Sequence, residues 1–278
     1  MSLDKLRSMK RLVANLDEIL GLVDLGAHFF VGHSGGKDSQ AMFAILSTII
    51  PADQLHVVHA DLGEVEHLNV KDFIRKNIDG HELKVAHAIH ADGSKKDFFS
   101  AVRARRAKLD ADGKFDAPAF PGSGPRFCTS DLKTGPIWKL IRNSSDAKIV
   151  VNCVGIRGQE SPARAKKIAN RGTLNENKKN SNTIRKAFDW WPIADWSIEQ
   201  VWAAIEAKGQ ERHAAYDAGN DRLSCVFCIF GSRGDLARGK LARPDLFKKY
   251  ADLERDVRGT MFNGETLAAR INSLGATK

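Results

Sequence analysis

A short glycine-rich stretch at residues 34–39 carries the residue types needed to bind phosphate. It lies between an apolar run at 27–31 and a helical pattern at 40–50. Glycines let backbone N–H groups approach phosphate oxygens, and the N-terminus of a following helix carries partial positive charge. The spacing differs from that of the ordinary P-loop, so the stretch predicts a phosphate-binding loop of another kind. Its residues are Ser34, Gly35, Gly36, Lys37, Asp38 and Ser39.

Two further residues follow the second predicted strand at the point where it ends. Asp61 and Gly63 come directly after the apolar stretch 54–60. Open α/β sheets bind their ligands beyond the carboxyl ends of the strands. Asp61 is therefore a candidate to accept a hydrogen bond from a ribose or to hold Mg²⁺. The alternative is that its carboxylate simply caps the loop.

The cysteines are spaced as metal or redox residues. Cys225 and Cys228 form a Cys-x-x-Cys pair, and thiolates bind soft metals and iron–sulfur clusters. Cys153 lies inside the apolar stretch 149–154, where a free thiol behaves as a small hydrophobe. It is nevertheless a candidate fourth ligand. The spacing predicts a metal or redox site, either an iron–sulfur cluster or a zinc site if His213 or Cys153 completes a set of four.

Alternating strands and helices are predicted to position these residues. Apolar runs predict strands at 27–31, 54–60, 82–90 and 148–155. Helical periodicity predicts helices at 3–23, 40–50, 65–77, 97–109, 130–143 and 197–207. Residues 110–126 and the polar stretch 168–186 are expected to be loops. Alternation of this kind favours an α/β fold with a doubly wound, mostly parallel, Rossmann-like sheet.

Composition and charge narrow the classes of partner. Lys and Arg total 43 against 34 for Asp and Glu, a net charge of +9. This excess suits a nucleotide, a sulfonucleotide or a nucleic acid, although a solvated basic surface would also account for it. No stretch approaches the roughly 20 apolar residues of a membrane span, and residues 1–15 lack the features of a cleaved leader. A cytoplasmic chain without membrane contact is expected.

Five segments together resemble the phosphoadenylylsulfate (PAPS) reductase family, in the order that the family has them. The loop at 34–39 resembles the pyrophosphate-binding loop of the adenine nucleotide alpha-hydrolase, or PP-loop ATP pyrophosphatase, superfamily. The other four segments are 127–136, 155–164, 191–202 and 213–228. Cys128 is followed by Thr129 where cluster-containing reductases have a second cysteine, and no cysteine follows Cys228. The chain therefore looks closer to the sulfurtransferase-like branch associated with DNA phosphorothioation and with phage-encoded members.

The resemblance implies a function, cofactors and partners. It implies an ATP pyrophosphatase that adenylates an acceptor, releases pyrophosphate and transfers sulfur, with Mg²⁺ held through Asp38 or Asp61. Cys128 would join Cys225 and Cys228 as ligands of a 4Fe-4S cluster. The expected partners are an adenine nucleotide (ATP or a PAPS-like nucleotide), a sulfur donor such as a cysteine desulfurase, a DNA or RNA acceptor and a second copy of the chain. Reduction of PAPS or adenylylsulfate and a non-catalytic nucleotide-binding subunit are the alternatives.

Several charged residues have expected roles at this site. Arg157, Glu160 and Arg164 follow Gly155 at the end of the fourth predicted strand, where guanidinium groups can grip phosphate bidentately. A helical i, i+4 pair between Glu160 and Arg164 is the alternative. Lys133 is expected to neutralise nucleotide phosphate or to lie beside a cluster. The expected chain organisation is a helix at 1–26, a nucleotide-binding α/β domain at 27–196 and a helical extension with the Cys-x-x-Cys pair at 197–278.

Overall fold

The computed structural model describes residues 8, 11–122, 124 and 126–273. The predicted helix at 3–23 therefore lies partly outside the described residues, and its described part is helix α2, Leu16–Asp24. Residues 123 and 125 of the predicted loop at 110–126 also lie outside them. Twelve α-helices are described, with these bounds: α2 Leu16–Asp24, α3 Lys37–Leu46, α4 Val70–Lys76, α5 Phe98–Ala111, α6 Phe127–Thr129, α7 Gly135–Ser144, α8 Pro162–Arg171, α9 Ile198–Ala207, α10 Ala214–Asp217, α11 Arg233–Ala242, α12 Pro244–Asp256 and α13 Leu267–Asn272.

The described strands form a six-stranded sheet in the order β3-β2-β1-β4-β6-β5. Strand β1 pairs in parallel with both β2 and β4, and β4 pairs in parallel with β6. The fold is therefore α/β and mostly parallel, as the alternating pattern predicted. The strands are β1 His28–Gly32, β2 Leu55–Asp61, β3 Leu83–His87, β4 Ile149–Cys153, β5 Leu174–Glu176 and β6 Lys186–Trp190.

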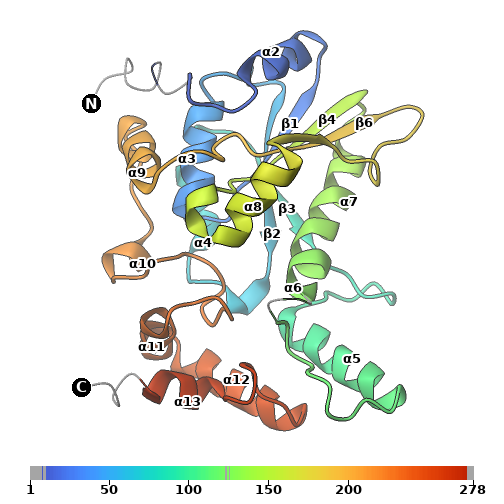
Figure 1. The fold of residues 1–278 in the computed structure, drawn as a ribbon, viewed down its shortest axis with the longest axis vertical. Coiled ribbons are helices and arrows are strands. Elements are labelled where there is room, and N and C mark those ends of the chain that lie inside the picture. The colour runs from blue at the N-terminus through green and yellow to red at the C-terminus, as the bar shows by residue number, and fades with distance from the viewer. Residues whose placement is uncertain (1–7, 9–10, 123, 125, 274–278) are drawn as a thin grey trace. The chain divides into compact units, whose positions relative to one another are not determined.

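Helices lie on both sides of the central strands, which explains why those strands are almost entirely apolar. Phe29, Phe30 and Val31 of β1 are all fully buried, as expected of a parallel strand covered on both faces. Figure 1 shows α3 and α7 to either side of β1. On the α7 side, Trp138 and Ile141 pack against the strands. On the other side, α3 contacts both β1 and α9.

Helix α9 begins where the sequence predicted it. The Ser197 hydroxyl accepts a hydrogen bond from the Gln200 backbone N–H, and the Gln200 side-chain oxygen accepts one from the Ser197 backbone N–H. This capping box satisfies two donors that the first turn of a helix would otherwise leave open. The predicted cap is confirmed.

The stretch at 168–186 is more ordered than predicted. Helix α8 continues to Arg171, and β5 pairs antiparallel with β6 at the edge of the sheet. The prediction of a loop was wrong here because the polar residues of β5 do not alternate with apolar ones. The stretch is held from the neighbouring strand instead, as when the side chain of Asn177, the residue after β5, donates to Asp189 of β6 at 2.8 Å.

The chain divides into two compact units, each built from three segments. Unit 1 comprises residues 1–59, 69–85 and 137–213, and unit 2 comprises residues 60–68, 86–136 and 214–278. The predicted boundaries at 26/27 and 196/197 divide the chain into consecutive segments. Each compact unit instead combines segments that are far apart in the sequence. Unit 1 holds most of the sheet. Unit 2 has its own core, in which Phe98, Phe227 and Tyr250 lie ring against ring.

No helix among the described residues is long and apolar enough to cross a membrane.

Candidate functional site

The glycine-rich loop of unit 1 joins β1 to the first turn of α3. Gly36 is the N-cap of α3, and no side chain caps that turn. Gly35 has a φ of 77°, in the left-handed region that favours glycine. The Ser39 hydroxyl donates to the Gly36 carbonyl at 2.8 Å and tightens the turn. The loop thus leaves the N-terminus of a ten-residue helix without a side-chain cap, which is an arrangement that attracts anions.

Three backbone N–H groups of the loop are satisfied by side chains of the same segment. Ser34 donates to the Ser39 hydroxyl at 3.1 Å, and Gly36 donates to the Ser34 hydroxyl at 3.4 Å. Gly35 donates to Nδ1 of His33 at 3.1 Å. These bonds keep the loop curled without a ligand. A phosphate oxygen would compete most easily for the longest of them, the one from Gly36.

Gly155 lies against the first turn of α3. A methyl group at this position would come within 3.1 Å of the Asp38 carbonyl carbon and oxygen, and within 3.3 Å of the Ser39 nitrogen. These are backbone atoms, which cannot rotate away as a side chain could. Gly155 therefore serves the loop by leaving space for it.

Arg157, Asp38 and Lys37 form a chain of charges beside the loop. Arg157 is 3% exposed, and its Nε lies 2.5 Å from Asp38 Oδ1. Its Nη1 donates to the Gln159 side chain at 2.9 Å and to the Trp196 carbonyl at 3.1 Å. The other Asp38 oxygen lies 3.7 Å from the Lys37 ammonium. Arg157 thus fixes Asp38, and Asp38 holds Lys37 near the helix N-terminus.

Glu160 and Arg164 form the i, i+4 ion pair that was the alternative to phosphate binding. Glu160 also accepts from the Arg157 backbone N–H at 3.3 Å. The pair lies at the start of α8, whose N-cap is Ser161. The three charged residues of unit 1 that were predicted outside the loop thus contact one another: Arg157, Glu160 and Arg164.

His33 directly precedes the loop, and no sequence motif singles it out. It is 2% exposed, and burial together with the nearby His59 lowers its pKa from 6.5 to about 3. Because Nδ1 accepts from Gly35, the ring proton must be on Nε2. That Nε2 is buried without a hydrogen-bond partner in the structure. The neutral ring therefore sets the conformation of Gly35.

We expect the stability of the protein to fall on acidification because of His33. Between pH 6.5 and about 3 the unfolded chain binds a proton at this residue and the folded chain does not. The free energy of unfolding should therefore decrease by about 1.4 kcal/mol per pH unit below 6.5 from this group alone. Urea unfolding of the wild type and of His33→Asn, compared at pH 7 and pH 5, measures this. Equal pH dependence in the two proteins would remove His33 as the cause.

In unit 2, Asp61 holds its own loop together. The carboxylate is 5% exposed, and one oxygen accepts from the Gly63 backbone N–H at 2.8 Å. The other oxygen lies 3.0 Å from the Lys95 ammonium and 3.3 Å from His87 Nδ1. Gly63 has a φ of 70°. The loop-cap interpretation describes this geometry, and both oxygens are already engaged by donors of unit 2.

Cys128, Cys225 and Cys228 all belong to unit 2. Cys128 lies in α6, and Cys225 bridges to Glu66 in an antiparallel pairing. The Cys228 carbonyl accepts from Gly231 N–H at 2.8 Å, which closes a turn. Cys128 and Cys225 pack against the core of the unit.

The electrostatics place the three thiols and Lys133 in one neighbourhood. Burial raises the pKa of Cys225 to about 12, opposed by Lys133 and reinforced by Cys228 and Cys128. Burial also acts to lower the pKa of Lys133, but the charges of the three cysteines and Glu66 outweigh it, and that pKa is raised. The lysine thus stays an ammonium ion beside groups that become anionic when they bind a metal.

Lys133 is positioned by an unusual helical turn. Residues Ser130–Thr134 are π-helical, and the Gly135 N–H donates to the Ser130 carbonyl. A side chain at Gly135 would come within 3.0 Å of that carbonyl oxygen. The α-helix predicted over 130–143 is therefore wrong for its first turn. Such π-turns are frequent at functional sites because they turn a side chain away from the regular helical direction.

The other two candidate ligands lie in unit 1. Cys153 is fully buried in β4, where burial raises its thiol pKa well above the usual value. His213 packs edge-on against Phe73. Within the described part of the chain, no three His, Cys, Asp or Glu side chains converge as ligands of one metal ion. Zinc needs that convergence, whereas a four-iron cluster distributes its thiolates over several irons. Three thiols with a lysine beside them are a donor set that such a cluster can use.

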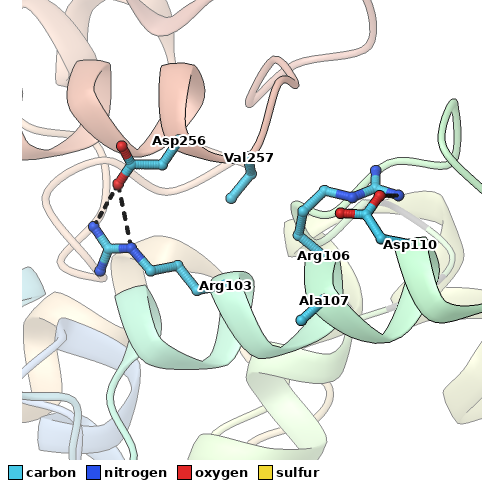
Figure 2. A pocket seen from close by; sticks show the side chains of 6 residues that line it. All are labelled: Arg103, Arg106, Ala107, Asp110, Asp256 and Val257. Carbon is cyan, nitrogen blue, oxygen red and sulfur yellow. Dashed lines mark hydrogen bonds and ion pairs between the residues drawn. The ribbon is translucent and has the colours of Figure 1, made fainter.

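Unit 2 also contains an open cavity of about 440 Å³, which is lined by residues of α5 and by residues 256–257. Figure 2 shows that its charged residues pair with one another, Arg103 with Asp256 and Arg106 with Asp110. Arg106 also donates to the backbone carbonyls of Lys114 and Ala117. The charges of this cavity are thus used to hold α5 in place, and we assign it no function.

One protein-family profile matches a stretch of the chain that includes both the glycine-rich loop and the cysteines of unit 2. The profile of the phosphoadenosine phosphosulfate reductase domain matches residues 28–230. An uncharacterized protein of Methanocaldococcus jannaschii, MJ0973, is 27% identical over 220 residues, 79% of this chain and 46% of that protein. An uncharacterized 37.8 kDa protein of Escherichia phage 186 is 28% identical over 138 residues, 49% of this chain and 39% of that one. The chain thus spans less than half the length of these relatives.

Solved structures give more distant likenesses. The PAPS reductase of Candida auris, a phosphate complex, is 13% identical, with 81% of this chain and 96% of that one covered and a TM-score of 0.47. The U34-tRNA thiolase NcsA of Methanococcus maripaludis, solved with its [4Fe-4S] cluster, is 15% identical, with 90% and 71% covered and a TM-score of 0.40. The family itself follows from the profile, which spans most of the chain: this protein belongs to the phosphoadenosine phosphosulfate reductase family.

Proposed function

We propose that this chain binds ATP on the loop of unit 1, adenylates an acceptor with release of pyrophosphate, and supports replacement of the adenylate by sulfur. The observation that carries the proposal is the uncapped N-terminus of α3, with Lys37 beside it. Helix dipole, backbone donors and the ammonium all place positive charge where a polyphosphate carries negative charge.

The first step is a substitution at phosphorus. An acceptor oxygen attacks the α-phosphorus of ATP and the bond to the bridging oxygen breaks. Pyrophosphate leaves with that electron pair, and the acceptor proton passes to water. Lys37 and the N-terminus of α3 stabilise the charge that grows on the leaving group. Asp38 and Arg157 act as positioning residues, because their 2.5 Å contact fixes the partner of Lys37.

Mg²⁺ would enter with the nucleotide. One Asp38 oxygen faces Arg157 and the other faces Lys37, while both Asp61 oxygens face donors of unit 2. These carboxylates are poor candidates for direct ligation. Mg²⁺ commonly keeps several waters and is held largely by substrate phosphates, which suits a site where the protein supplies cations.

The second step is a substitution at the activated acceptor. Sulfur at the sulfide level attacks the acceptor atom that bears the adenylate, a carbon in a base or the phosphorus of a backbone phosphate, the bond from that atom to the adenylate oxygen breaks and AMP leaves. Cys128, Cys225 and Cys228 would hold a 4Fe-4S cluster, which supplies an iron with no protein ligand. Lys133 remains protonated beside these thiolates and offsets their charge. We propose DNA or RNA as the acceptor, a cysteine desulfurase as the sulfur source and the DNA-phosphorothioation or phage-type branch as the nearest relatives.

The test is a product analysis on the anaerobically purified full chain. ATP, Mg²⁺, DNA or tRNA, cysteine and a cysteine desulfurase are supplied, and pyrophosphate and AMP are quantified. Parallel reactions with PAPS or adenylylsulfate and a thiol reductant are assayed for sulfite. We expect pyrophosphate and AMP in equal amounts from ATP. Sulfite without pyrophosphate would replace the proposal with sulfonucleotide reduction, and ATP binding without either product would indicate a non-catalytic subunit.

A further inference from the structure

An exposed phenylalanine lies at the tip of the turn that follows the Cys-x-x-Cys pair. The turn is closed by the 2.8 Å hydrogen bond from Gly231 N–H to the Cys228 carbonyl. A side chain at Gly231 would come within 3.1 Å of that oxygen, so the turn is tight. Phe230 sits two residues after Cys228 and is 39% exposed, which is unusual for a ring of this size.

An arginine from the Cys128 segment lies over one face of that ring. The Arg126 guanidinium carbon lies 4.4 Å from the centroid of the Phe230 ring. The Arg126 carbonyl accepts from Thr129 N–H at 2.9 Å, and so begins the turn that contains Cys128. The Arg126–Phe230 pair therefore joins the two segments that supply the three cysteines of unit 2.

A second pair of the same kind flanks the first. The Arg105 guanidinium carbon lies 5.2 Å from the centroid of Phe127, the residue immediately before Cys128. Arg105 is held by a 3.3 Å hydrogen bond to the Pro118 carbonyl. Asp131, an acid of the same segment, is paired with Lys96 at 3.2 Å. Cations stacked on aromatic rings thus dominate this surface of unit 2.

We propose that this surface binds single-stranded nucleic acid, with an unpaired base stacked at Phe230 and the phosphate backbone held by Arg126 and Arg105. Exposed aromatic rings and arginines are what single strands bind, because every unpaired base offers a flat π-face. A duplex hides those faces. The net charge of +9 suits the same partner. This assignment names the acceptor class and rests on the proposed function for its chemistry, although not for its binding.

The binding test uses the full chain without ATP. Fluorescein-labelled oligothymidylate, oligouridylate and a DNA duplex are titrated, and anisotropy is followed at several salt concentrations. We expect both single strands to bind more tightly than the duplex, and the ratio of the first two distinguishes DNA from RNA. Phe230→Leu should weaken single-strand binding by about 10-fold, since a lost stacking contact commonly costs that much. Phe230→Tyr should bind as the wild type does.

Phe115→Leu is the matched control. Phe115 is also an exposed phenylalanine of unit 2, at 65% exposure, and its replacement should leave binding unchanged. Arg126→Gln should lower the slope of log affinity against log salt by about 0.7, the value for one single-strand phosphate contact. Unfolding temperatures of all variants verify that they are folded.

Two outcomes would overturn the proposal: wild-type binding by Phe230→Leu, or a duplex that binds as tightly as the single strands. The proposed function is tested separately by Lys37→Ala, which should keep oligonucleotide binding. Oligonucleotide binding that depends on Phe230 in a protein that releases no pyrophosphate would leave this inference standing and remove the function. Pyrophosphate release by the wild type, together with oligonucleotide binding that is unchanged in Phe230→Leu, would leave the proposed function standing and remove this inference.

Discussion

Lys37→Ala is expected to weaken ATP binding about 100-fold, because the ammonium is the one positively charged side chain among residues 34–39. Charged hydrogen bonds commonly contribute roughly 1.5–3 kcal/mol, and about 1.4 kcal/mol corresponds to a tenfold change in affinity. Removing Lys37 also leaves Arg157 as the cation that faces Asp38. The Asp38 carboxylate, no longer offset by Lys37, then repels the incoming phosphates more strongly, which lowers the affinity further. Isothermal titration with ATP measures the change.

Lys76→Ala provides the control for this measurement. Lys76 is an exposed lysine in the last turn of α4, in the same unit as the loop. Its replacement removes the same charge from the protein, so it should lower ATP affinity only slightly through long-range electrostatics. Equal affinity in Lys37→Ala and the wild type would mean that ATP does not bind at this loop.

Cys225→Ser is expected to abolish stable cluster binding in protein purified without oxygen. The wild type should contain about four iron and four sulfide per chain and absorb broadly near 400 nm. A serine oxygen is a harder and weaker ligand for iron than a thiolate. Cys225 packs against the core of unit 2, so the replaced side chain has little freedom to recruit water in its place. Iron and sulfide analysis with a visible spectrum measures the loss.

Cys153→Ala is the matched control for the cluster. This thiol is fully buried in β4 and belongs to unit 1, so its replacement should leave the iron content unchanged. Full iron in Cys225→Ser would remove this residue from the ligand set. Zinc in place of iron in the wild type would make the cysteines structural, and the proposed function would reduce to adenylation.

The parts of the fold that the sequence predicted best are those set by neighbouring residues. The strand, loop and helix around Ser34–Ser39 follow from a buried apolar run, two glycines and a helical period. The Ser197 cap follows from a four-residue pattern. Strand β5 escaped prediction because its order comes from pairing with β6, a contact that its own polar residues do not encode.

The same distinction between local pattern and long-range contact holds for the candidate site. Glycine, lysine and cysteine motifs indicated which residues carry chemistry, but not which of them contact one another. The pairing of Arg157 with Asp38 joins two segments 119 residues apart. His33 carries no motif, and its role depends on burial and on one hydrogen bond from Gly35. The cation–aromatic pair of Arg126 and Phe230 likewise exists only after the chain has folded.

The interleaving of the two units has a consequence for how the protein is made. The chain passes from one unit to the other after residues 59, 68, 85, 136 and 213. The glycine-rich loop at 34–39 is synthesised long before residue 213, at which its unit becomes complete. Apolar strands such as β1 therefore remain unprotected in the nascent chain until residue 213 has been translated. Such an arrangement of units favours dependence on chaperones during synthesis, and not after the protein has folded.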